Sequence, residues 1–462
     1  MKRLDNFSRF RALRDEFPFL AYDSYHYSYN AKNLEIIFQF SLSDKYFFKP
    51  AIRIPYKPDI LIEPEILSVK VLDNLVFHMG MIELISYWKA ACPPKVIIRQ
   101  HTLSEKQVDF WKRIYFNGLG EFFFMNSIPV GFNDFMHIES VADDPVVPFD
   151  LPAPSGSIVP VGGGKDSAVS MGLLNQAGAD WIPFTLNPGK ASRDVISAAG
   201  KKPGQCLEMN REIDPRLLAL NDKGFLNGHT PFSALLAFYS LLAGYLSYRN
   251  EIILSNESSA NEATVPGTTI NHQYSKTFEF ESEFRTYAGE FISKGFSYYS
   301  LLRPLSEIQI ASAFSKMPEF FDVFKSCNAG SKKDTWCGKC PKCLFTFIIL
   351  SPFLEPERLC AIFGRNLLDD PSLETIFDEL TGFSENKPFD CVGTIMEVNA
   401  ALDASLVKFE GESFPYLLKR HKDRRKAEEK GLIAGLEKLI QHFDPDHFVP
   451  EKHYGLLKNA VK

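Results

Sequence analysis

The hydrophobic and polar positions of the first part of the chain alternate one by one. Residues 1 to about 62 place aromatic and aliphatic side chains at every second position, most clearly in 33–40, and Pro50, Pro55 and Pro58 separate the runs. A period of two is typical of strands with one buried face. The pattern therefore predicts a small antiparallel sheet at the start of the chain.

The spacing then becomes helical. Between residues 64 and 91 apolar residues recur on one side, and the two prolines at 93 and 94 end the pattern. A further helix is expected to begin after Thr102 or Ser104, either of which can cap it, and to end at Gly118.

From residue 158 to about 320, short apolar runs alternate with helical patterns. The expected strands are 158–161, 181–186, 205–209, 251–255 and 298–302. The longest apolar stretch, 231–248, is interrupted by Ser233, Ser240 and Gly244, which favours a buried helix over a membrane span. Thr230 is its expected N-cap, with Pro231 at the first helical position.

This alternation predicts an α/β fold with a Rossmann-like, doubly wound parallel sheet. Ligands of such sheets bind at the carboxyl ends of the strands, near the switch in strand order. Residues 141–157 resemble a linker in composition, so we expect three regions: an α+β domain at 1–150, a nucleotide-binding domain at 151–325 and a helical region at 326–462. The charged run from Lys419 to Lys430 is expected to be a solvated helix face.

Composition narrows the class of protein. The 462 residues are 45% hydrophobic and 23% charged, with a net charge of −6, which describes an ordinary globular protein without an overall basic field. Long nucleic acid is therefore not the expected partner, although a small anion needs only a local basic pocket. The N-terminus lacks a signal-peptide core, no membrane association is expected, and the cysteine usage favours a reducing cytoplasm. The pattern leaves the oligomeric state open.

The most informative stretch joins the first expected strand of the middle region to its helix. Gly162, Gly163 and Gly164 are followed by Lys165, Asp166 and Ser167. Glycines let the backbone approach an anion, and the free amides at a helix start point toward it. The spacing is that of neither a Walker loop nor Gly-x-Gly-x-x-Gly. It resembles the pyrophosphate loop (PP-loop) of the ATP pyrophosphatases, Ser-Gly-Gly-x-Asp-Ser, with glycine in place of the first serine.

Four of the eight cysteines are closely spaced: Cys327, Cys337, Cys340 and Cys343. Pairs of thiolates two residues apart suit a knuckle that presents both sulfurs to one ion, and four thiolates close a tetrahedral shell. We therefore expect a structural Zn²⁺, with an iron–sulfur cluster as the alternative. The other four, Cys92, Cys206, Cys360 and Cys391, are isolated and are expected to be buried thiols.

With both motifs in view, the chain resembles the UDP-N-acetylmuramoyl-L-alanyl-L-glutamate epimerases, a branch of the PP-loop proteins. In that family Gly-Gly-Gly-Lys-Asp-Ser is the usual form of the loop. The resemblance covers roughly residues 83 to 393. The matching stretches are 87–94, 117–122, 162–167, 228–229, 255–257, 266–267, 271–273, 298–307, 336–343, 363–370 and 387–389.

The resemblance implies an isomerase that uses ATP and Mg²⁺ to invert the terminal L-Glu of UDP-MurNAc-L-Ala-L-Glu, through an acyl-adenylate, in bacterial cell-wall synthesis. The glycines and Ser167 would cradle phosphates, Lys165 would neutralise developing charge, and Asp166 would hold Mg²⁺ or orient the loop. His229 and His272 are the acid/base candidates, with Glu257 also counted as catalytic. Substrate binding is assigned to Asn256, Lys276 and Arg303, the last as a bidentate grip on a carboxylate.

A second class of function stays open at this point. A PP-loop ligase or sulfurtransferase would also adenylate its substrate, a nucleobase or RNA. The acidic composition argues against RNA.

Overall fold

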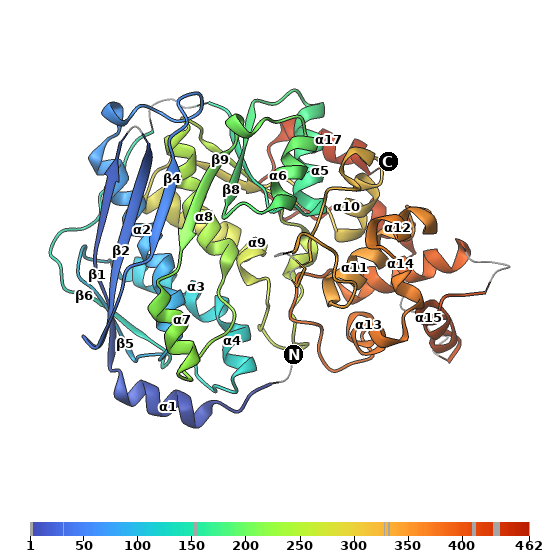
Figure 1. Cartoon of the computed structure of the whole chain (residues 1–462), viewed down its shortest axis with the longest axis horizontal. Coiled ribbons are helices and arrows are strands. Elements are labelled where there is room, and N and C mark those ends of the chain that lie inside the picture. Colours follow the sequence, from blue (N-terminus) through green and yellow to red (C-terminus); the bar gives the residue numbers. More distant parts are fainter. Residues whose placement is uncertain are drawn as a thin grey trace.

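The computed structural model describes residues 3–30, 32–151, 155–327, 329–330, 333–408, 413–427 and 435–461. Within them, eleven strands form a single sheet with the order β11-β10-β7-β8-β9-β4-β2-β1-β5-β6, and β3 pairs with β2. The sheet extends from the N-terminal strands to the middle of the molecule, and helices of the C-terminal part lie beyond it (Figure 1).

The N-terminal strands form the antiparallel sheet that the alternation predicted, but the sheet begins only at Phe19, because Phe7–Glu16 form the helix α1. The strands are β1 (Phe19–Tyr29), β2 (Asn33–Leu42), β3 (Tyr46–Phe48) and β4 (Ala51–Pro55). Along β2 buried and half-buried residues alternate, because one face packs on α2 (Val69–Trp88). Two strands that the pattern did not reveal, β5 (Lys95–Ile98) and β6 (His137–Ser140), extend this sheet in parallel with β1.

The middle strands are all parallel to one another. They are β7 (Ser157–Pro160), β8 (Trp181–Leu186), β9 (Leu207–Glu212), β10 (Glu251–Leu254) and β11 (Ser297–Ser300). Successive residues of these strands enter different cores: Ile158 joins the core that contains α2, and Val159 the core that contains the C-terminal helices. This part of the sheet is therefore covered on both faces.

The sheet continues across the boundary expected near residue 150. Strand β4 of the N-terminal part pairs with β9 in the antiparallel sense, Arg53 opposite Asn210 and Ala51 opposite Glu212. Below this junction Glu83 on α2 forms an ion pair with Arg211 on β9. The two regions thus share one sheet and one core.

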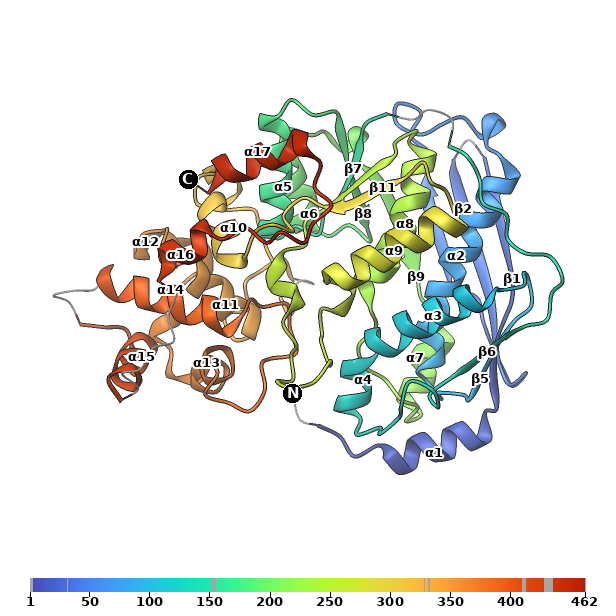
Figure 2. The same cartoon turned by 180° about the vertical axis from the view of Figure 1, so that it is seen from behind.

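The helices on one face of the sheet include α2, α3, α8 and α9. In Figure 2, which shows the molecule from behind, they lie on the viewer's side of the sheet. Of the two caps that the sequence left open, Ser104 caps α3, with a complete capping box. Pro231 and not Thr230 is the N-cap of α8. The helices up to α9 are α1 (Phe7–Glu16), α3 (Glu105–Gly118), α4 (Gly120–Met125), α5 (Lys165–Gln176), α6 (Lys190–Ala198), α7 (Pro215–Asp222), α8 (Phe232–Leu246) and α9 (Phe278–Phe291).

The C-terminal region is helical. Its elements are α10 (Glu307–Phe314), α11 (Pro341–Leu350), α12 (Pro356–Phe363), α13 (Glu374–Thr381), α14 (Ile395–Lys408), α15 (Tyr416–Ala427), α16 (Leu436–Gln441) and α17 (Glu451–Ala460). The charged run on α15 is not simply solvated, because Arg420 and Arg424 both pair with Asp378 on α13. Residues 428–430 of that run lie outside the described residues.

Helix α8 is buried along most of its length, as its apolar pattern predicted. Across the ranges described above, no helix combines the length and the apolar character needed to cross a membrane.

Candidate active site

The glycine loop connects β7 to α5 at the carboxyl end of the strand. Gly163 has φ +93°, and a Cβ there would come within 2.8 Å of the backbone nitrogen of Ser192. Gly164 is the N-cap of α5 and offers no side-chain cap, so the first amides of the helix stay available to an anion. Ser167 donates its hydroxyl to the carbonyl of Gly164 over 3.0 Å.

A second helix begins beside this loop. Gly189 is the N-cap of α6, again without a side-chain cap, and residues 189–192 line the same cavity as Gly162 and Gly164. Two helix starts therefore face one space, which concentrates backbone amides and positive dipole ends on it.

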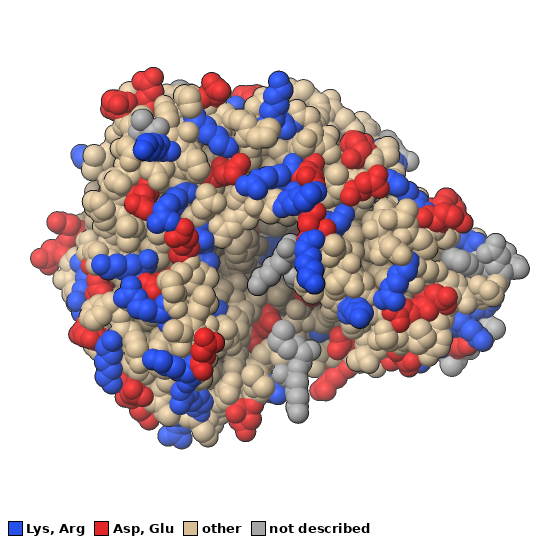
Figure 3. All heavy atoms as spheres, in the orientation of Figure 1, with Lys and Arg blue, Asp and Glu red and all other residues tan. Residues whose placement is uncertain are grey.

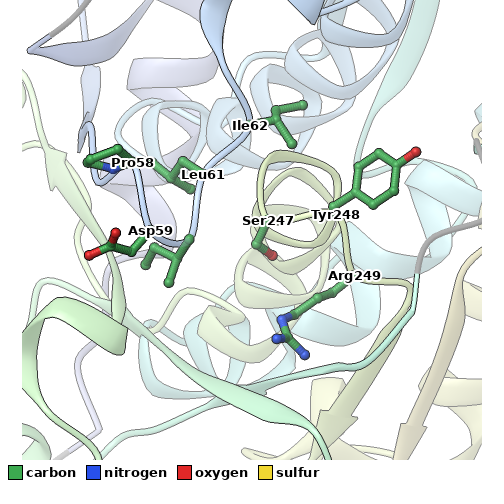
Figure 4. Close-up of a pocket in the computed structure, with 8 residues that line it drawn as sticks. Pro58, Asp59, Leu61, Ile62, Ser247, Tyr248 and Arg249 are labelled. Atoms are coloured by element: carbon green, nitrogen blue, oxygen red, sulfur yellow. The ribbon is translucent and has the colours of Figure 1, made fainter.

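The cavity has a volume of about 680 Å³, within the usual range for small-molecule sites. It also contains Asn256, which follows β10, the strand next to β7. The face shown in Figure 3 is hollowed between the sheet-containing part and the C-terminal helices, and acidic and basic side chains are interspersed around it. A smaller cavity of about 210 Å³, between Pro58–Ile62 and Ser247–Arg249, contains none of the expected site residues (Figure 4).

The large cavity is rich in lysine. Lys190, Lys276, Lys325 and Lys342 line it and come from four different segments. Burial would lower the pKa of Lys276, but Cys391, Glu257 and other acidic groups raise it well above its ordinary value, so the ammonium stays charged. Such a pocket suits a ligand with several negative charges.

Lys165 was expected to reach a phosphate in the cavity, but its side chain lies inside the protein. It is almost fully buried, pairs with Asp166 and Glu307, and is not part of the cavity lining. Oxygens of Asp166, Glu257 and Glu307 lie within 4.8 Å of one another. Burial raises the pKa of Glu307 to about 8, against the opposing effect of Lys165, and Asp166 and Glu257 raise it further.

Both candidate histidines line the cavity and meet at one carboxylate. Nδ1 of His272 lies 2.5 Å from Oε2 of Glu121, and Nδ1 of His229 lies 3.3 Å from the same oxygen. Burial lowers the pKa of His229 to about 4, helped by the neighbouring His272. Burial also acts to lower the pKa of His272, but Cys391 and Glu121 raise it to about 9.

Cys391 departs from the expectation of an isolated buried thiol. It lines the cavity, and its Sγ lies within 4.8 Å of a ring nitrogen of His272. Burial would raise the pKa of the thiol, but Lys276, Lys342 and His272 lower it to about 5.

Arg303 does not fit the role of a substrate grip. Its guanidinium is fully buried, donates to Glu281 and to the carbonyls of Glu257 and Lys276, and lies outside the cavity lining. Because these donors are used inside the protein, Arg303 supports the cavity wall instead of contacting a ligand. Asn256 does face the cavity, and its amide donates to Ser300 over 3.1 Å.

The four clustered cysteines come together as their spacing predicted. Sγ–Sγ distances are 3.8 Å for Cys327–Cys340, 3.7 Å for Cys337–Cys343 and 3.5 Å for Cys340–Cys343. Thiolates about 2.3 Å from a central tetrahedral ion would lie roughly 3.8 Å apart, so the cluster can hold a metal ion such as zinc. Cys327 also lines the cavity, and the amide of Lys325 donates to the carbonyl of Gly163 over 2.8 Å.

Comparison with known families agrees with the resemblance seen in the sequence. A family model described as the MurL N-terminal domain matches residues 12–301, and one described as the MurL C-terminal domain matches residues 323–430. The chain belongs to the MurL family. The first model covers the N-terminal and middle strands together, in keeping with their common sheet.

Three relatives carry the name UDP-N-acetyl-alpha-D-muramoyl-L-alanyl-L-glutamate epimerase. The protein from Xanthomonas oryzae pv. oryzae is 36% identical over 70% of this chain and 72% of its own length. Those from Salinispora tropica and a Micromonospora species are each 34% identical, over 81% and 73% of this chain and 82% and 76% of their own lengths.

For several residues in or beside the cavity of this MurL-family chain, the sequence predicted no part in the site. Glu121 lies behind the cavity wall, in a stretch that matched the family, and only its position in α4 shows that it contacts the two histidines. Lys342 lies between two cysteines of the predicted metal site, so its local pattern indicates a metal site and not a cavity wall. Lys325 and Cys391 had no local pattern, because they reach the cavity only through the fold of the C-terminal region.

Proposed function

We propose that this protein is an ATP-dependent epimerase that inverts the terminal L-Glu of UDP-MurNAc-L-Ala-L-Glu to D-Glu, for bacterial cell-wall synthesis in the cytoplasm. The observation that carries the proposal is one cavity that joins a glycine loop and four lysines to a His–Glu–Cys cluster. The named relatives support the substrate. They give no support to a ligase or sulfurtransferase.

The glycine loop is proposed to bind ATP as a PP-loop. Counted along the chain, the middle strands have the order 3-2-1-4-5, the usual order of Rossmann-like sheets, which supports this assignment. The order switches between β7 and β10, and Gly162 and Asn256 follow these two strands into the cavity. The amides at the starts of α5 and α6 would stabilise pyrophosphate as it leaves.

Mg²⁺ is proposed to bind at the carboxylates of Asp166, Glu257 and Glu307. A hard cation prefers several oxygens, and these three residues converge within 4.8 Å. Oε2 of Glu257 is buried and has no hydrogen-bond partner among the described residues, which also suits a ligand atom. Lys165 would then hold Asp166 and Glu307 in place instead of contacting phosphate directly.

Adenylation explains why an epimerase needs ATP. A proton next to an ionised carboxylate is hard to remove, because the resulting carbanion lies beside a negative charge. Converting the carboxylate to an acyl-adenylate removes that charge and lets the carbonyl accept the electron pair. If the pKa of the carbon acid fell by about ten units, the effect would amount to roughly 14 kcal/mol.

The cysteine cluster is proposed to hold a structural zinc ion. Four thiolates leave no open position for substrate, so the ion would act through the fold. It would fix residues 325–327 against the glycine loop and the start of α11 at the cavity.

The test is a product assay in D₂O with the dipeptide substrate, ATP and Mg²⁺. We expect AMP, diphosphate and a D-Glu product that carries deuterium at its alpha carbon, with no exchange when ATP is left out. ADP and phosphate as products would refute the PP-loop assignment. AMP without deuterium in any product would refute the epimerase and favour an acyl-transfer ligase.

A further inference from the structure

The two histidines of the cavity lie side by side. The ring centroids of His229 and His272 are 4.5 Å apart, and both rings contact the same oxygen of Glu121. A carbon that exchanges protons with two groups needs each of them within about 3–3.5 Å, so the groups must be separated by roughly 6–7 Å. Inversion at the alpha carbon therefore requires a further group.

The segment that carries Cys391 is held against the loop that carries His272. Gln273 donates to the carbonyl of Val392 over 3.2 Å, and the amide of Lys387 donates to the carbonyl of Thr264 over 3.2 Å. The hydroxyl of the same Thr264 accepts from the amide of His272 over 3.0 Å. The position of the thiol in the cavity is thus fixed by contacts on both sides of it in the sequence.

The surroundings of Cys391 are those of an activated thiol. A ring nitrogen of His272 lies within 4.8 Å of the sulfur, and Nδ1 of the same ring contacts Glu121, so the cluster contains a thiol, an imidazole and an orienting carboxylate, as in cysteine enzymes. Lys276 and Lys342 face the same thiol from other walls, and Asp390 precedes it in the chain. The positive groups lower the pKa of Cys391 to about 5 against the effect of burial, while His272, with a pKa of about 9, keeps its proton at neutral pH.

We propose that Cys391 is a catalytic residue that exchanges the proton on one face of the alpha carbon, with His272 and Glu121 as its positioning residues. This proposal rests on the proposed epimerase function. The thiolate removes the alpha proton, so that an S–H bond forms while the C–H bond breaks. The electron pair passes to the carbonyl of the acyl-adenylate. A second group of the cavity returns a proton to the opposite face, and both groups then regain their starting protonation by exchange with solvent.

The experiment compares the full-length wild type with Cys391→Ala and with Cys360→Ala, a matched change on α12 away from the cavity. Each epimer of the dipeptide substrate is incubated with ATP and Mg²⁺ in D₂O, and AMP release and alpha-deuterium uptake are measured separately. For Cys391→Ala we expect AMP release close to that of the wild type, and deuterium uptake into at least one epimer reduced by about 100-fold or more. Cys360→Ala should match the wild type in both.

Two outcomes overturn the role of Cys391. Normal deuterium uptake into both epimers would remove it from proton transfer, and a joint loss of AMP release and uptake would place it in binding or adenylation. Failure of the wild type to release AMP or exchange deuterium is a different result, because it refutes the epimerase function itself.

A second measurement covers the case in which Cys391→Ala does not fold. Wild-type protein is treated with iodoacetamide at pH 6, and the labelled cysteines are mapped by mass spectrometry. Rapid labelling of Cys391 that ATP and substrate block supports the proposal. A Cys391 that stays unmodified even at pH 8, while Cys360 reacts, overturns it.

Discussion

At the scale of single residues, Gly163 is where the glycine loop has no room for a side chain. Its φ is +93°, and a Cβ would press on the backbone of Ala191 and Ser192 at the start of α6. For Gly163→Ala we expect the Kd for ATP to rise by about tenfold or more, roughly 1.4 kcal/mol, because the two helix starts would be forced apart. Calorimetric titration with ATP measures this.

Gly178→Ala is the matched control for that change. Gly178 also has a positive φ, +60°, at the end of α5, but nothing lies within 4 Å of a Cβ there. It should share the backbone strain and leave ATP binding intact. Equal weakening in the two variants would show that strain, and not the contact with α6, is responsible.

On the proposed mechanism, Glu121 is expected to set the alkaline limit of proton exchange. The thiolate of Cys391 exists above a pH of about 5, and the imidazolium of His272 persists up to about 9, so the pair is intact between these values. The raised pKa of His272 stabilises the fold below its ordinary pKa of about 6.5, and this contribution disappears as the pH rises through 9. The depressed pKa of Cys391 stabilises the fold above about 8.5, and that contribution disappears as the pH falls through 5.

For Glu121→Gln we expect the alkaline limit of deuterium exchange to move down by about one pH unit or more, because the imidazolium loses its carboxylate. The measurement is kcat/KM for exchange across pH 5 to 10. An alkaline limit at the wild-type position would contradict this role for Glu121.

Residue types predicted the cavity better than they predicted individual contacts. Gly162, Asn256 and Lys276, which the sequence assigned to ATP or substrate binding, all line the cavity. Arg303 was assigned to the substrate by its chemistry alone, yet Glu281, which lies far from it in the sequence pattern, engages its guanidinium. A distant partner such as Glu281 leaves no trace in the local sequence around Arg303, and the cavity beside Cys391 is assembled from other segments, so local sequence predicts neither environment.

At the scale of elements, the cysteine knuckle joins the C-terminal region to the glycine loop. The spacing of the cysteines alone predicted the knuckle, because four thiols so close in sequence are typical of a metal site. For Cys340→Ser we expect loss of about one zinc ion per chain, a lower melting temperature and weaker ATP binding, since residues 325–327 and Lys342 would lose their positions. Metal analysis and ATP titration on the same sample test this.

Cys360→Ser serves as the control and should keep its zinc. A Cys340→Ser protein with a full complement of zinc would contradict the site. Iron and sulfide found in the wild-type protein would favour an iron–sulfur cluster over zinc at this site.

At the scale of the whole molecule, the junction between β4 and β9 unites the N-terminal and middle regions. Glu83 is fully buried, accepts from the hydroxyl of Tyr239 over 2.8 Å and pairs with Arg211. For Glu83→Ala we expect unfolding free energy to fall by about 3–5 kcal/mol, because a buried guanidinium would lose its partner. Urea denaturation measures the loss.

The exposed pair Arg53–Glu212 at the same junction provides the comparison. Its side chains are 40% and 57% exposed, so Glu212→Ala should cost less than about 1 kcal/mol. Similar losses for both variants would argue that the junction itself, and not the buried charge, is what each mutation disturbs.

The sequence predicted most strands and helices of this molecule but not that they share one sheet. Alternation and apolar runs report which faces of an element are buried, and they do so locally. The pairing of Arg53 with Asn210 joins residues that no local pattern connects. The short strands β5 and β6 were missed because they lie outside the regular alternation of strands and helices that revealed the equally short β7, β10 and β11.

The residues that line the cavity are translated at very different times. A nascent chain presents the glycine loop long before Lys342 and Cys391 leave the ribosome, and His272 comes from a segment between them. Contacts between such distant residues form slowly. On the proposed function, the adenylating half of the site is therefore made of earlier-translated segments than the thiol, and a chain released before residue 391 would carry the glycine loop without the cysteine proposed to act on the activated substrate.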